Sequence, residues 1–100
     1  MADIFLEIVV KAAEATAVGI ESRDEIEDVL ERVLSDSGVA EVTDGGGGSG
    51  VYVVDIEIES EDKFEDALSV IRAVLQELNV PKSTQIKRGR PSEKIFAVYA

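Results

Sequence analysis

The most conspicuous chemical pattern in this chain is the glycine run Asp44-Gly45-Gly46-Gly47-Gly48-Ser49-Gly50, which holds five of the eight glycines. Its letters satisfy the spacing G-x-G-x-x-G. In dinucleotide-binding proteins that spacing opens a helix whose N-terminus faces the pyrophosphate. Here the run lies between two strand-like segments, and no Lys-Ser or Lys-Thr follows it as in a Walker-type phosphate loop. We therefore predict the tip of a β-hairpin.

Three interpretations of this tip stay open. It is a mobile connection between two strands, or a nest of bare amides that holds an anion. Asp44 opposes the second interpretation, because its charge would repel the anion. The letters Gly-Gly-Gly-Gly-Ser also match an engineered flexible linker.

Carboxylates form the second chemical pattern. Glu7 lies in one predicted strand, and Asp55, Glu57 and Glu59 alternate along another. Paired carboxylates can perform acid–base chemistry or bind Ca²⁺ and Mg²⁺. The chain has no histidine and no cysteine, shows no EF-hand spacing, and offers no evident nucleophile. We therefore expect no catalytic residues, no metal ligands and no cofactor, and we interpret the carboxylates as a solvated sheet face.

Apolar residues alternate on the same predicted face as these carboxylates. An apolar patch rimmed by acids is typical of an interaction surface. The predicted surface consists of Phe5, Glu7, Val9, Val51, Val53, Asp55 and Glu57. Two copies of the chain could pack through it, or a basic partner could be steered to it. The alternative is that the last strands of the chain itself cover this face.

Hydrophobic periodicity predicts the elements that must position these residues. Residues 12–19 show no clear period and either prolong the first strand or form the crossing to the first helix. Strands are predicted at Ile4–Val10, Val39–Thr43, Val51–Glu59, Thr84–Arg88 and Lys94–Tyr99, with a turn at Gly89-Arg90-Pro91. Helices are predicted at 23–37 and from Ser60 or Asp62 to Leu78.

Local signals mark the ends of both helices. Ser22 and Glu25 have the spacing of a capping box, in which each side chain bonds the other residue's amide. Gly38 is a stop signal for the first helix. Asn79 can take the left-handed conformation after the second helix, and Pro81 prevents its continuation.

The predicted fold is a single α+β domain spanning residues 1–100. The element order β-α-β-β-α-β, with a further C-terminal strand, fits a two-layer ferredoxin-like split βαβ sandwich. Two amphipathic helices would cover one face of an antiparallel sheet. The first and third strands should be central, because they are the longest and alternate most clearly.

Charge is distributed unevenly along the chain, whose net charge is −11. Residues 1–80 have a balance of −15, and residues 81–100 have +4. The acidic bulk argues against nucleic-acid and anionic-lipid partners. The basic segment Lys87-Arg88-Gly89-Arg90 either grips a phosphate or acidic partner, or offsets the acidic body and discourages strand pairing. Lacking an apolar run of about 20 residues and a signal-peptide start, the chain is expected in the cytoplasm.

Several segments resemble a group of small uncharacterised bacterial proteins. The matching residues are Gly38-Val39-Ala40-Glu41-Val42-Thr43, the glycine run, Asp55-Ile56-Glu57-Ile58, Ala67-Leu68, Ile71-Arg72, Leu75 to Leu78, and Pro81 to Thr84-Gln85-Ile86. The shared pattern is a glycine-rich turn followed by a strand, a helix and a Pro-x-x-Thr segment. Four successive glycines depart from this pattern, and the resemblance implies no activity.

These observations predict a non-enzymatic acidic domain that works through protein–protein contact, with a protein partner or a second copy on the open sheet face. An immunity-type role is one form of this prediction, by fold-level analogy. The alternative is a small-ligand regulatory domain of the PII or ACT type, with its site at the glycine run or at a subunit interface. A carboxylate-based enzyme is a third, weaker hypothesis.

Overall fold

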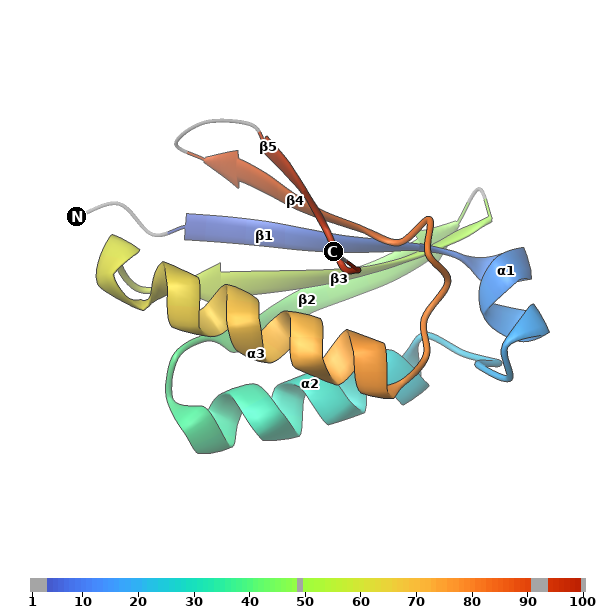
Figure 1. The fold of residues 1–100 in the computed structure, drawn as a ribbon, viewed down its shortest axis with the longest axis horizontal. Coiled ribbons are helices and arrows are strands. Elements are labelled where there is room, and N and C mark those ends of the chain that lie inside the picture. Colours follow the sequence, from blue (N-terminus) through green and yellow to red (C-terminus); the bar gives the residue numbers. More distant parts are fainter. Residues whose placement is uncertain (1–3, 49, 91–93, 100) are drawn as a thin grey trace.

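The computed structural model describes residues 4–48, 50–90 and 94–99, of which 44, 47, 48, 89 and 90 are described by their backbone alone. These residues form five strands and three α-helices, with the sheet as one layer, two of the helices as the other, and the first, short helix at the end of the sheet (Figure 1). The strands are β1 (Ile4–Lys11), β2 (Glu41–Gly48), β3 (Val51–Ile58), β4 (Gln85–Arg90) and β5 (Lys94–Ala97). The helices are α1 (Ala12–Ala17), α2 (Asp24–Ser37) and α3 (Phe64–Glu77), the last preceded by a 3₁₀ turn, η1 (Glu61–Lys63).

The sheet is antiparallel throughout, with the strand order β2-β3-β1-β4-β5. Helices α2 and α3 run side by side on one face of it (Figure 1). As predicted, β1 and β3 lie inside the sheet, since β1 has β3 and β4 as neighbours and β3 has β2 and β1. The extra C-terminal strand, also predicted, continues the sheet beyond β4.

The core lies between the sheet and the two helices. Alternate residues of β1 and β3 point into it, as do the apolar faces of α2 and α3. Buried strand residues are Ile4, Leu6, Ile8, Val10, Val54, Ile56, Ile58 and Ile86. Buried helix residues are Ala15, Ile26, Leu30, Leu34, Phe64, Ala67, Leu68, Ile71, Val74 and Leu75. The opposite residues of each strand are thereby left on the other face of the sheet.

The helix ends confirm the stop signals but correct one start signal. Gly38 has φ 71° after α2, and Asn79 has φ 61° two residues after α3. The capping box predicted for Ser22 and Glu25 is wrong. The Glu25 carboxylate instead accepts a hydrogen bond from the Glu21 amide at 2.9 Å, and no side chain caps α2 at Arg23. The cause is a turn before the helix, in which the Glu25 amide donates to the Ser22 carbonyl at 3.3 Å.

The glycine run differs from its prediction as a hairpin tip. Gly45 to Gly48 belong to β2 and pair with Val54 to Val51 of β3, so the connection shortens to residues 49 and 50. Glycine backbones donate and accept ladder hydrogen bonds as other residues do, and the long strand β3 supplies partners for all of them. Gly50, with φ 81°, takes the left-handed conformation that favours glycine. Its carbonyl accepts from the Ala12 amide at 2.8 Å.

The remaining differences lie at element boundaries. Residues 12–17, predicted either to prolong the first strand or to cross to the first helix, form a short helix of their own, α1, which ends before Gly19 at φ 96°. Strand β4 runs on to Arg90 where a turn was predicted, because a register shift between its pairs with Phe5 and Leu6 accommodates the extra residue. Of the predicted turn, Pro91 lies outside the described residues. Strand β5 ends at Ala97 rather than Tyr99.

Candidate functional site

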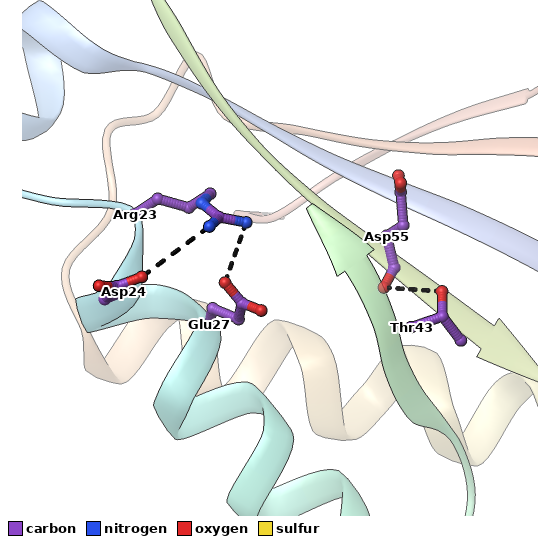
Figure 2. Close-up of polar contacts among 5 residues, drawn as sticks. All are labelled: Arg23, Asp24, Glu27, Thr43 and Asp55. Carbon is purple, nitrogen blue, oxygen red and sulfur yellow. Dashed lines mark hydrogen bonds and ion pairs between the residues drawn. The ribbon is translucent and has the colours of Figure 1, made fainter. Parts of the chain in front are cut away.

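The structure places all seven residues of the predicted interaction surface on the sheet face that lies away from α2 and α3. The β1–β3 register sets Phe5 opposite Glu57, Glu7 opposite Asp55, and Val9 opposite Val53. Val51 faces Lys11 one pair further along. Figure 2 shows the Asp55 side chain directed away from α2. We call this surface the open face.

The outer strands add residues that sequence reasoning did not assign to this surface. Lys87 of β4 pairs with Glu7, and Ile95 of β5 pairs with Lys87. Glu41 of β2 pairs with Glu57 on the other side. The alternation Lys94-Ile95-Phe96 contained the signal for Ile95, because Phe96 packs on Phe64 in the helix layer and its neighbour must point the opposite way.

A hollow of about 780 Å³ lies on this face. Its lining residues are Phe5, Leu6, Glu7, Thr43, Asp55, Lys87, Arg88, Lys94 and Ile95. The lining therefore joins three of the predicted surface residues, Phe5, Glu7 and Asp55, to residues from the outer strands. Val9, Val51, Val53 and Glu57 share the face but lie outside the hollow.

Exposed apolar side chains mark this face. Phe5 is 39% exposed and Ile95 is 58% exposed, whereas Val9, Val51 and Val53 are half-buried. The described residues do not support the alternative in which the last strands of the chain cover this face. Strand β4 lies beside β1 and β5 lies beside β4 in the same sheet, so both strands widen the face instead of covering it.

The charges of the open face are concentrated on neighbouring strands. Glu7 lies directly opposite Asp55, and Glu41 directly opposite Glu57. Like charges at opposite positions of a ladder destabilise it by about 0.2–1 kcal/mol. Lys87, on the other side of Glu7, offsets part of this repulsion. Residues that reduce the stability of the fold, as these opposed carboxylates do, are common at functional surfaces.

Metal binding and acid–base chemistry need several ligating or ionisable groups in one place. Within the described part of the chain, no three carboxylates come together in a way that could hold a metal ion. The chain has no histidine or cysteine to act with them. What the face does offer is apolar area beside concentrated negative charge.

The glycine run touches the helix layer at one point. Arg23, at the start of α2, extends toward the end of β2 and pairs with Glu27 at 3.0 Å and Asp24 at 3.9 Å (Figure 2). Its guanidinium lies where a side chain at position 45 would begin, and the Val53 carbonyl lies 2.8 Å from the same point. Gly45 therefore permits a close approach of arginine to the sheet. The amides of Gly45 to Gly48 belong to strand β2, so these glycines do not form a loop whose bare amides could hold an anion.

The basic segment near the C-terminus does not converge on one site in the residues described. Lys87 lies on the open face, but Arg88 points to the helix layer, where it pairs with Glu61 and stacks 4.5 Å from the centre of the Phe64 ring. Alternation along β4 separates the two charges. The positions of Lys87 and Arg88 do not support the interpretation in which this segment binds a phosphate as one group.

The fold of this chain is similar to that of a designed protein of known structure. The de novo designed protein LFR1 1, a ferredoxin fold solved by solution NMR, is 19% identical to this chain and matches it with a TM-score of 0.52. The match covers 97% of this chain and 83% of the designed one. The predicted ferredoxin-like α+β sandwich is thus confirmed, and the likeness extends to the fold alone.

Sequence comparisons give no family to set beside the fold. No protein-family model and no curated protein matches the chain. The resemblance to small bacterial proteins stays a prediction. No described helix is long and apolar enough to cross a membrane.

Proposed function

We propose that this protein works through protein–protein contact made by its open sheet face. The observation that carries the proposal is the exposure of Phe5 and Ile95 on a sheet face over which no described element packs. In a small domain, apolar side chains gathered on one face beside acidic ones are typical of an interaction surface. The proposed role is non-enzymatic, and the partner is another protein or a second copy of the chain.

The experiment replaces apolar residues of the open face by lysine. Phe5→Lys with Ile95→Lys, and separately Val51→Lys with Val53→Lys, would place charges in the contact. Val18→Lys is the matched control, because Val18 is 40% exposed but follows α1, away from the face. Circular dichroism verifies that every variant folds. Analytical ultracentrifugation then measures self-association, and affinity capture measures partner retention.

The proposal expects an assembly or a captured partner that both double variants lose and Val18→Lys retains. Loss of the aromatic anchor alone would weaken an interface contact by about 2 kcal/mol or more if Phe5 is a hot spot. A monomeric chain that retains no partner would contradict the proposal. So would an assembly that survives both double variants.

A second candidate function is the binding of a small ligand, as in regulatory domains of the PII or ACT type. The hollow of about 780 Å³ favours it, because acidic Asp55, basic Lys87 and apolar Ile95 line one concavity. Thermal-shift screening with nucleotides and amino acids tests this candidate, since a ligand that binds the folded state raises the apparent stability. A ligand whose shift persists in the Phe5→Lys, Ile95→Lys variant would place its site elsewhere.

A further inference from the structure

The charge of the open face favours one kind of occupant over the other. Among the described side chains, the face carries the carboxylates of Glu7, Glu41, Asp55 and Glu57 against the ammonium groups of Lys11 and Lys87. Arg88 and Lys94 also line the hollow, but their charged groups lie on the side of the helix layer, where Arg88 pairs with Glu61 and Lys94 lies 5.3 Å from the centre of the Phe96 ring. The chain as a whole has a net charge of −11. A second copy would bring the same excess of negative charge, so self-association is opposed by repulsion. A cationic surface would be attracted instead.

The register strengthens this argument locally. Glu7 and Asp55 lie directly opposite each other near the middle of the face. A positive charge placed above them would be attracted by both carboxylates and would reduce their mutual repulsion. The binding energy would therefore include relief of a cost that the free protein carries.

The shape of the face favours a helix over a strand. Its apolar groups are spread across strands, with Val53 on β3, Phe5 and Val9 on β1, and Ile95 on β5. Neighbouring strands are about 4.8 Å apart, so these groups span more width than one added strand would contact. A helix about 10 Å in diameter can lie on this width, as α2 and α3 lie against the opposite face of the sheet.

We propose that the open face binds a cationic amphipathic helix of a partner protein, an inference that rests on the proposed function. Its apolar stripe would lie in the hollow against Phe5 and Ile95. Lysine or arginine residues on the flank of the stripe would lie over Glu7 and Asp55. The complex would have helices on both faces of the sheet, with the fold otherwise unchanged.

The test uses designed peptides with the full-length chain. The probe is a peptide of about 18 residues, roughly five turns, with leucine at helical spacing and lysine elsewhere. One comparison peptide has the same composition scrambled to remove the apolar stripe, and another carries glutamate in place of lysine. Calorimetry measures affinity at about 0.15 M salt, where distant charges are screened. Amide chemical shifts locate the bound peptide.

Two triple variants separate the face from the overall charge. The face variant is Glu7→Gln, Asp55→Asn, Glu57→Gln. The control is Asp28→Asn, Glu31→Gln, Glu65→Gln, which removes the same charge from exposed positions of α2 and α3. We expect the face variant to weaken binding of the probe by about tenfold or more and the control by less than about threefold. Shift changes should gather on β1, β3 and β5.

The outcomes also separate this inference from the proposed function. Equal binding of the scrambled or glutamate peptide, equal losses in both triple variants, or shifts confined to α2 and α3 would overturn the inference. Absence of probe binding would overturn it as well. If the lysine variants of the face nevertheless abolish an assembly, protein contact through the face stands and its occupant is not a cationic helix. If neither experiment responds, both proposals fail.

Discussion

At the scale of single residues, two adjacent glycines of the same run have different roles. Gly45 faces the helix layer, where the Arg23 guanidinium and the Val53 carbonyl leave no room for a Cβ atom. Gly46, one residue on, faces the open side, and a Cβ there would meet no atom within 4 Å. The sequence shows four identical letters, and only the strand register distinguishes them.

Gly45→Ala should therefore destabilise the fold while Gly46→Ala should not. Overpacking of this kind typically costs about 1–3 kcal/mol, and the backbone carbonyl of Val53 cannot yield as a side chain would. Replacing Gly46 removes backbone entropy from the unfolded chain and should be neutral or stabilising by about 0.5 kcal/mol. Urea unfolding of both variants measures the difference. Equal midpoints would show that Arg23 and β2 adjust without cost.

At the scale of elements, the two layers and the hairpin of β2 and β3 were predictable, but the extension of β2 through the glycine run was not. The alternation in β1 and β3 and the apolar faces of α2 and α3 dominate burial, so periodicity located β1, β3 and α2 to within one residue at each end. The predicted start of α3 lies two to four residues too early, because a 3₁₀ turn precedes the helix. The same alternation assigned all seven predicted surface residues to one face. Glycine-rich β2 has no such pattern, because its pairing is decided by the neighbouring strand and not by its own side chains.

The alternation in β5 indicates which way Ile95 points, but the contacts that hold the end of this strand were not predictable. Strand β5 has four residues, and side chains of α3 bond to the backbone at and just after its C-terminal end. Arg72 donates through Nε to the Ala97 carbonyl at 2.9 Å, and Gln76 donates through Nε2 to the Val98 carbonyl at 2.7 Å. These long-range contacts have no sequence signature, yet they help position Ile95 on the open face.

Arg72→Ala with Gln76→Ala should loosen β5 selectively. Each hydrogen bond contributes about 0.5–1.5 kcal/mol, so the amides of β5 should lose protection in native-state hydrogen exchange. The paired amides of β1 and β3, which lie in the middle of the sheet, should change less. Ser69→Ala, an exposed substitution on α3, is the control and should leave β5 protection unchanged. A uniform loss across the sheet would mean that β5 opens only with the whole molecule.

At the scale of the whole molecule, stability and binding should make opposite demands on the open face. The chain has a net charge of −11, and the face adds carboxylates at directly opposed ladder positions. Self-repulsion of this kind destabilises a compact state and is screened by salt. If the face is kept acidic for a cationic partner, its carboxylates are retained at a cost to the free protein, as expected of functional surfaces.

The two triple variants that test helix binding also measure how much stability these carboxylates cost the free protein. At low salt, Glu7→Gln, Asp55→Asn, Glu57→Gln should raise the free energy of unfolding by about 1 kcal/mol, because it relieves cross-strand repulsion as well as net charge. Asp28→Asn, Glu31→Gln, Glu65→Gln relieves net charge without relieving cross-strand repulsion, and it loses the favourable charge of Glu65 in the first turn of α3, so it should gain less. The gap should narrow as sodium chloride is added, since screening removes the repulsion from both proteins. Equal gains in the free energy of unfolding at low salt would show that the cost comes from the overall charge. The carboxylates of the open face would then add no cross-strand repulsion that binding could relieve.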